Sequence, residues 1–469
     1  MIAIFSGYLL WIFISKVVTP EIIGISSTII SLMIIFSSFV DMGVSAGATR
    51  FLARSFSERR SGDTRVLVKS SLLIVFSGLL FCSAAIVAFR DWVYPNIELN
   101  LVLLTIPLIG TLVIASLLRS ILVASLDTKS LPKIMIISSI CKIISTVILV
   151  LLGTGVIGIT MGYLWSYLSA LVILSYLLVT KIMPTKKEPT IRLFHTCKDI
   201  LIAGVPTWIP QIISIIGMNL GTIIVFGIAG ANQAGTYFIA TSIFHGISSI
   251  RGSLFEVGFP VVSSMDDQRK RLVWKLIKMS LVITLPISST FIAYSEEVMM
   301  FIGSGFQQGS LLLKILMLSM LPSTIGAGIA ILVYSYGNYW KVLAIGLGAT
   351  LSRVLFYLML VPLYGNIGAA VGCLVGSIVG FVVSLMVAKK IGLSIFWKEL
   401  GLTFVIPMGL AFVFEYFGVN YMIGIPAILV ICIVLYIRSH ILSKSEIHEY
   451  LEMLPNRIGK PLIDIINRL

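Results

Sequence analysis

The apolar positions of this sequence form long runs that are separated by short polar connections. Each run has roughly 17–25 residues, which is enough for a helix to cross a bilayer core of about 30 Å. We predict about fourteen such spans, at residues 2–18, 26–48, 70–89, 101–124, 134–152, 156–180, 201–226, 233–257, 279–295, 311–334, 342–362, 366–388, 401–417 and 424–440. The connections are too short for a soluble catalytic domain, so the pattern predicts an all-α, polytopic membrane protein.

One segment of this pattern occurs twice, because residues 121–170 align without a gap on residues 331–380, 210 positions later. Apolar residues match by chance in any membrane protein, so the glycines decide the comparison. The glycine pairs are Gly155 with Gly365, Gly158 with Gly368, Gly162 with Gly372 and, at an offset of 211, Gly24 with Gly235. We therefore expect two similar halves in the same order (1–190 and 195–390), a pair of helices in 391–440, and an amphipathic cytoplasmic tail over 441–469. Repeats of this kind are common in transporters.

Composition supports the membrane prediction and narrows the chemistry. Apolar residues make up 58% of the chain and charged residues only 12%, against about 25% charged residues in soluble proteins. The five cysteines lack paired spacing, so neither a disulfide framework nor a metal site is expected. No GxxxxGK[ST] phosphate-binding loop occurs. We therefore expect no ATP hydrolysis and no cofactor.

The net charge of +14 is distributed unevenly along the chain. Lysine and arginine gather in alternate connections, above all in 50–69, 181–198 and 269–278, and in the tail. The opposite connections hold only Lys16 and Arg90 among basic residues, together with several glutamates. Cytoplasmic loops carry the excess of basic residues, so both termini are expected in the cytoplasm and the protein in the cell membrane. The charge indicates topology and not a nucleic-acid partner.

Five basic residues lie within or near the predicted spans, where a charge at mid-bilayer costs about 2.5–3.5 kcal/mol. Lys142 and Arg353 are near the middle of their spans and one position apart in the repeat, since 142 plus 210 is 352. They should face protein or water. Arg119 and Lys314 lie nearer span ends and fit snorkelling. The fifth is Arg251. These positions predict a central, water-filled, cationic cavity between two six-helix lobes, with an anionic ligand.

Two acidic residues are candidates for a second role. Asp41 lies one position from the repeat equivalent of Arg251, since 251 minus 211 is 40, and Glu256 lies further along the same span as Arg251. Each acid could form an ion pair that holds helices together, or could couple transport to protons or sodium ions. Both interpretations remain open at the level of sequence.

Several segments, in order, resemble those of a known family. They are ISKVVTPEIIGISSTIISL, FVDMGVSAGATRFLA, AGVPTWIPQI, VGFPVVSSM and VPLYGNIGAAVG. With these segments the chain resembles the Wzx-like, PST-type polysaccharide flippases of the MOP exporter superfamily, over nearly its whole length. The resemblance implies two parallel-repeat six-helix lobes in a V, as in MATE transporters, followed by two C-terminal helices. The first span, from residue 2, is shorter than its repeat counterpart. Either it is short or the natural start lies upstream.

The resemblance also implies a function. The substrate would be an undecaprenyl- or related polyprenyl-diphosphate-linked oligosaccharide, moved from the cytoplasmic to the outer leaflet for O-antigen-like or glycoprotein glycan export. Basic residues would hold the diphosphate: Lys16, Arg50 and Arg251 match by position, and depth adds Lys142 and Arg353. Coupling to the membrane potential, to H⁺ or to Na⁺ is left open. So is a partnership with other membrane proteins of polysaccharide assembly.

Three rival functions remain. A drug/cation antiporter of the same superfamily would favour an acidic cavity, and the basic excess argues against it. A major-facilitator carrier also has two six-helix halves but lacks the segments named above. A membrane-embedded glycosyltransferase or polymerase would need a large outer loop with clustered acids. The short outer loops therefore favour a transporter over an enzyme.

Overall fold

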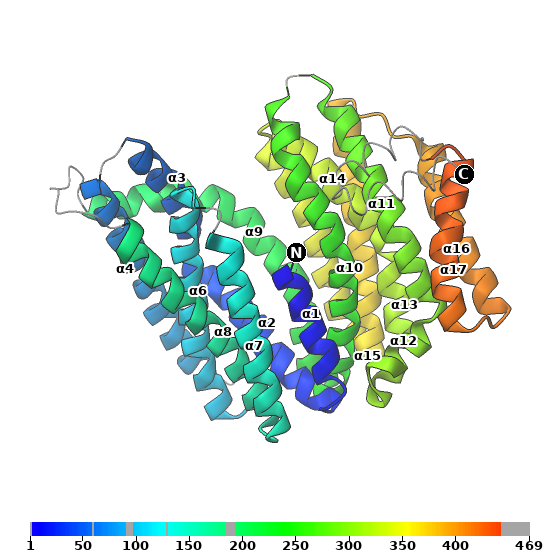
Figure 1. Ribbon diagram of the computed structural model, residues 1–469, viewed down its shortest axis with the longest axis horizontal. Coiled ribbons are helices and arrows are strands. Elements are labelled where there is room, and N and C mark those ends of the chain that lie inside the picture. The colour runs from blue at the N-terminus through cyan, green and yellow to red at the C-terminus, as the bar shows by residue number, and fades with distance from the viewer. Residues whose placement is uncertain are drawn as a thin grey trace.

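The computed structural model describes residues 2–58, 61–90, 97–127, 130–182, 193–265 and 267–441. Figure 1 shows two helical bundles that meet at one end and diverge towards the other, so that the molecule has the shape of a V. The bundles diverge at the end that carries α3 and the start of α15. The predicted tail from residue 442 onwards lies outside the described residues.

The first bundle contains the helices of the first half of the chain. They are α2 (Pro20–Asp41), α3 (Val44–Ser57), α4 (Ser61–Ala88), α6 (Leu99–Ala124), α7 (Ser130–Leu151) and α8 (Gly155–Leu177), followed by the π-helical turn η1 (Leu178–Ile182). α1 (Ile2–Ile14) lies between the two bundles, and α9 (Leu193–Ala229) runs across the top of the first bundle to the centre (Figure 1).

The second bundle contains the rest of the described chain. Its helices are α10 (Ala231–Ser264), α11 (Arg269–Ala293), α12 (Ser295–Ile302), the 3₁₀ turn η2 (Ser304–Gly309), α13 (Ser310–Leu318), α14 (Met320–Ser335), α15 (Tyr339–Ile391), α16 (Trp397–Tyr416) and α17 (Tyr421–Arg438). The last two helices pack on the outer side of this bundle (Figure 1).

Within the described residues, 11 helices are long and apolar enough to cross a membrane, fewer than the expected number. The difference lies in three places. The 53 residues of α15 are two helices that are separated at Gly365, where φ and ψ are not helical, so the predicted spans 342–362 and 366–388 are counted as one element. α1 has only 13 residues, and α10 is not among the eleven because its sequence is more polar. The chain is an all-helical, multi-pass membrane protein.

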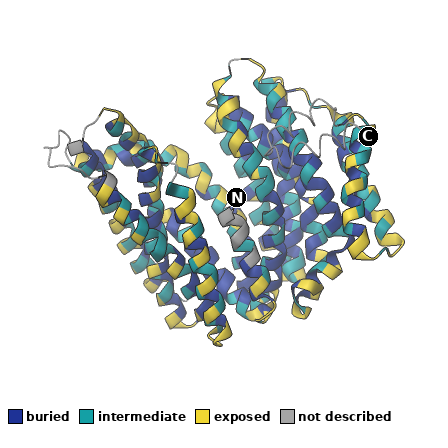
Figure 2. Cartoon of the chain, in the orientation of Figure 1, coloured by how far each residue is buried: buried dark blue, intermediate teal, exposed yellow. Residues whose placement is uncertain are grey.

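The outer surface of the bundles suits lipid. Large apolar side chains such as Leu80, Phe81 and Phe412 are more than two-thirds exposed, and Figure 2 shows exposed residues along the outer helix faces of both bundles. A contiguous apolar surface of this kind is rare on soluble monomers. In a bilayer it needs no cover, because helices satisfy their own backbone hydrogen bonds.

The predicted span at 26–48 is interrupted, which corrects the sequence-based expectation. Met42 and Gly43 have positive φ angles of 44° and 80° and separate α2 from α3. The Asp41 carboxylate accepts hydrogen bonds from the backbone N–H groups of Gly43 and Ser45, each 3.2 Å away, and from the Ser45 hydroxyl. These bonds satisfy N–H groups that the first turn of α3 leaves without a helical partner.

The repeat predicted from glycines has a counterpart in the backbone. Gly155 and Gly365, which pair at an offset of 210, both have positive φ, at 51° and 58°. Gly155 begins α8 after α7, and Gly365 separates the two helices of α15; the N–H of Asn366 donates to Gln233 Oε1 at 3.0 Å. Glycine adopts a positive φ without strain, so a glycine of this kind separates two helices at the same repeat position in both halves.

The two bundles make their closest approach where α2 crosses α10. A Cβ on Gly24 would overlap the carbonyl oxygen of Ala231, and a Cβ on Gly235 would overlap the carbonyl oxygen of Pro20. Small residues allow helix backbones to approach this closely in membranes. Because Gly24 and Gly235 also pair in the repeat, the contact lies near the pseudo-symmetry axis that relates the bundles.

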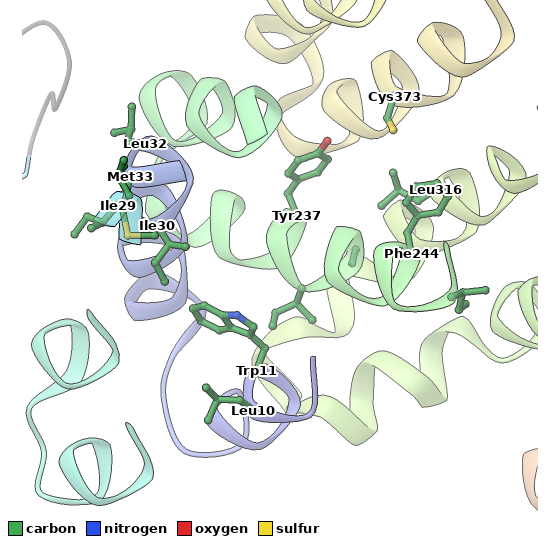
Figure 3. Close-up of a cluster of buried hydrophobic side chains, with 14 of the residues drawn as sticks. Leu10, Trp11, Ile29, Ile30, Leu32, Met33, Tyr237, Phe244, Leu316 and Cys373 are labelled. Carbon is green, nitrogen blue, oxygen red and sulfur yellow. The ribbon is translucent and has the colours of Figure 1, made fainter. Parts of the chain in front are cut away.

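The first turns of α9 pack on the first bundle, although this helix was expected to open the second half. A Cβ on Gly47 would overlap the carbonyl oxygen of Ile200, and Trp208 Nε1 donates to the Ser38 carbonyl oxygen at 2.8 Å. Figure 3 shows how Trp11 of α1 lies beside α2 and α10 within the buried apolar cluster. Both α1 and α9 therefore connect the two bundles.

Candidate functional site

The first bundle contains a cavity of about 190 Å³ that is lined by Arg119 of α6 and Lys142 of α7. Lys142 is half-buried, and among the described residues it forms no ion pair. Its Nζ lies 5.0 Å from the centroid of the Tyr163 ring. An aromatic face attracts a cation without neutralising it, so Lys142 keeps its charge available for an anionic ligand.

Lys142 also faces α1, because its Nζ lies 3.5 Å from where a Cβ on Gly7 would be. On the same helix, Trp11 Nε1 donates to the Tyr163 hydroxyl at 3.0 Å. The Trp11 ring meets Phe238 of the second bundle edge-on, with centroids 4.7 Å apart. This series of contacts runs from Lys142 through α1 to α10. The cation therefore lies where the two bundles face each other across α1.

The second bundle contains a cavity of about 310 Å³ between α9, α14 and α15, and Arg353 lines it. Arg353 Nη1 donates to the Gly217 carbonyl oxygen at 3.0 Å. Its Nε is buried without a hydrogen-bond partner. Among the described residues Arg353 forms no ion pair.

The two cavities correspond to each other in the repeat. Many lining positions are separated by 210 residues, namely Leu112 and Pro322, Ser116 and Gly326, Met135 and Ile345, Ser139 and Ala349, Tyr167 and Ser377, and Ala170 and Gly380. The first-bundle cavity includes Lys142 and the second-bundle cavity includes Arg353, the two basic residues that lie one position apart in the repeat. The structure therefore places Lys142 and Arg353 in two separate, repeat-related cavities, and does not bring them into one shared cavity.

The other residues singled out on α10 have different environments. Arg251 is half-buried, and its Nη1 donates to the hydroxyls of Ser323 at 2.9 Å and Thr324 at 3.4 Å. Ser323 also lines the second-bundle cavity, so Arg251 lies behind its wall. Glu256 is exposed, one and a half turns further along α10.

Lys16 and Arg50 are both exposed and lie far apart. Lys16 follows α1 at the end where the bundles meet, and its Nζ is 3.9 Å from the Phe301 ring centroid. Arg50 is on α3, at the end where the bundles diverge (Figure 1). They do not share a cavity with Lys142. Lys314, expected to be structural, pairs with Glu415 of α16 at 2.6 Å.

A third and more voluminous cavity was not predicted from sequence. It has a volume of about 780 Å³ and lies between α1 and the second bundle, with Tyr8, Trp11, Phe301 and Ile425 in its almost wholly apolar lining. The aromatic residues of α1 and α8 were also missed. Tyr163 and Tyr167 lie four residues apart on one helix face, a spacing that could have indicated an aromatic wall beside Lys142.

Comparison with known proteins agrees with this architecture. The model of a family described as polysaccharide biosynthesis protein matches residues 13–309, more than half of the chain. No curated protein matches the sequence. The fold is similar to an inward-facing MATE family multidrug transporter of the MOP superfamily (16% identity, TM-score 0.70, covering 83% of this chain and 94% of that one).

The fold is also similar to the lipid II flippase MurJ in an inward closed conformation (15% identity, TM-score 0.73, covering 94% of this chain and 99% of that one). An outward-facing MATE structure gives a lower TM-score of 0.55 at 18% identity, over 83% of this chain and 92% of that one. The chain therefore belongs to the polysaccharide biosynthesis protein family and is a multi-pass membrane protein whose fold is similar to those of the MATE transporter and of MurJ.

Proposed function

We propose that this transporter flips a polyprenyl-diphosphate-linked oligosaccharide from the cytoplasmic to the outer leaflet, for the export of a surface polysaccharide or a glycoprotein glycan. The observation that carries the proposal is the position of Lys142, a cation with no carboxylate partner among the described residues, beside α1 and between the bundles. A diphosphate is the anionic group that such a substrate would present to it. The family match supports a role in polysaccharide biosynthesis.

The cavities on the two sides of α1 suit the two parts of such a substrate. Gly7 faces Lys142, whereas Tyr8 and Trp11 line the apolar cavity of about 780 Å³. The diphosphate and its sugars are too polar to enter hydrocarbon, and the isoprenoid chain never has to leave it. Lys142, on one side of α1, would hold the diphosphate head group, and the apolar cavity on the other side would hold the isoprenoid chain.

The divergent bundles support transport by alternating access, in which one lobe rocks against the other around a central site. The bundles diverge at the end that carries the basic connections, which the positive-inside rule assigns to the cytoplasm. The crossing of Gly24 and Gly235 closes the other end. A negative-inside membrane potential favours the outward movement of an anion by about 2.3 kcal/mol per charge per 100 mV.

The test is translocation of a labelled lipid-linked oligosaccharide in vesicles that contain the purified protein, followed with a membrane-impermeant glycosidase. We expect Lys142→Ala to slow translocation about tenfold or more, because a hydrogen bond to a charged group contributes roughly 1.5–3 kcal/mol. Lys142→Arg should keep most of the activity because it keeps the charge. Lys314→Ala is the matched control, since its partner Glu415 lies on the outer helix α16.

Two results would contradict the proposal. If Lys142→Ala translocates the substrate at the wild-type rate, Lys142 does not hold the head group. If wild-type vesicles leave the lipid-linked sugar in place but exchange a cationic drug for H⁺ or Na⁺, the protein is an antiporter of the same superfamily.

A further inference from the structure

The cavity of the second bundle has a charge that its own residues leave uncompensated. Arg353 has one protein acceptor, the Gly217 carbonyl oxygen, while its Nε is buried without a partner. Arg251, behind the same wall, has only hydroxyl acceptors. Removing one partner of a buried pair strongly destabilises a protein because an uncompensated charge remains. Arg251 and Arg353 have no carboxylate partner among the described residues, so a bound anion would stabilise their charges.

The cavity extends from the diverging end of the V to this charge. Its lining begins at Val342, close to the start of α15 at Tyr339, and reaches Arg353. Fourteen residues of helix separate Tyr339 from Arg353, a depth of about 21 Å at 1.5 Å per residue. Ser214 and Ser377 add hydroxyl groups to the lining. The cavity thus offers a route from the basic end of the molecule to the guanidinium group, with polar groups near its inner part.

We propose that this cavity binds a small inorganic anion of the halide class at Arg353. The volume of about 310 Å³ is at the lower limit of small-molecule sites, which span about 300–1,000 Å³. Gly326, Gly346 and Gly380 contribute no side chain to the lining, which leaves space beside Arg353 for an ion with a few waters. The bound anion compensates Arg353 and joins α9, α14 and α15. The site differs from the one proposed for the lipid-linked substrate, so it does not depend on that function.

The experiment uses the full chain purified in detergent, with sodium gluconate replaced by chloride, bromide or inorganic phosphate at constant ionic strength. We measure equilibrium binding of radioactive chloride together with the thermal unfolding midpoint. The wild type should bind close to one chloride per chain with a saturable rise in the midpoint, and bromide should compete. Arg353→Gln should weaken binding at least tenfold. Lys314→Gln should leave it unchanged, because Lys314 does not line this cavity and pairs with Glu415 of the outer helix α16.

If Arg353→Gln does not fold, two milder variants replace it: one keeps the positive charge at position 353, and the other keeps Arg353 and changes a neighbouring residue of the lining. Arg353→Lys and Ser377→Ala should each change the chloride affinity or the preference for bromide over chloride by several-fold. The proposal is overturned by absence of saturable chloride binding in the wild type, or by binding that is unaltered in Arg353→Gln or in both replacement variants. Saturable binding of phosphate without competition by halides would also overturn it.

Discussion

Lys142 and Arg353 lie one position apart in the repeat, but their charged groups have different neighbours. Lys142 carries its charge on a single ammonium group beside the Tyr163 ring, whereas the guanidinium of Arg353 has five donors, one of which is committed to Gly217. The flexible side chain of Lys142 can follow a ligand that moves during transport. The planar arginine suits a fixed site within one bundle, so the two cations are expected to serve ligand transfer and bundle stability, respectively.

Asp41 is predicted to act as a cap and not as a coupling acid. Its carboxylate accepts bonds from the N–H groups of Gly43 and Ser45 at the start of α3. Asp41→Ala should lower stability by about 1 kcal/mol, the usual cost of a lost helix cap, and Asp41→Asn should retain most of it. Thermal unfolding measures this effect. An Asp41→Asn protein with wild-type stability but without ion-dependent transport would instead identify Asp41 as a coupling residue.

At the scale of elements, the sequence predicted what is local to each helix. Apolar run length determines where a helix can cross the membrane, and the glycine pairs indicated repeated positions, at two of which, Gly155 and Gly365, φ is positive. The break at Met42 and Gly43 was missed, because the apolar run continues through a turn that depends on the backbone bonds of Asp41. The packing of early α9 on the first bundle was also missed, since it depends on contacts between distant residues such as Trp208 and Ser38.

The crossing of α2 and α10 should tolerate no added methyl group. Gly24→Ala and Gly235→Ala place a Cβ against opposing backbone, and overpacking of this kind costs typically about 1–3 kcal/mol. We expect lower thermal stability and slower transport in both variants. Gly227→Ala is the control, because a Cβ there would meet nothing within 4 Å. Wild-type stability and transport in Gly24→Ala would show that the bundles are not held at this crossing.

At the scale of the whole molecule, the structure is a V with its diverging end at the basic connections. The TM-scores are 0.70 and 0.73 against inward-facing and inward closed relatives and 0.55 against an outward-facing one. The sequence predicted two duplicated lobes, but the placement of Lys142 and Arg353 in separate cavities could not be predicted. Depth along a helix follows from position in the chain, whereas the direction of a side chain depends on how the helices pack around it.

The most direct measurement follows translocation of the lipid-linked oligosaccharide while the two bundles are free or tied together. Cysteines replace the exposed residues Ala46 of α3 and Asn338 before α15, in a chain whose five native cysteines are replaced, and a cleavable cross-linker joins them. We predict that translocation stops on cross-linking and resumes after cleavage, because the lobes must rock. Translocation at the free rate while the lobes are tied would contradict it, as would a free protein that never moves the glycan.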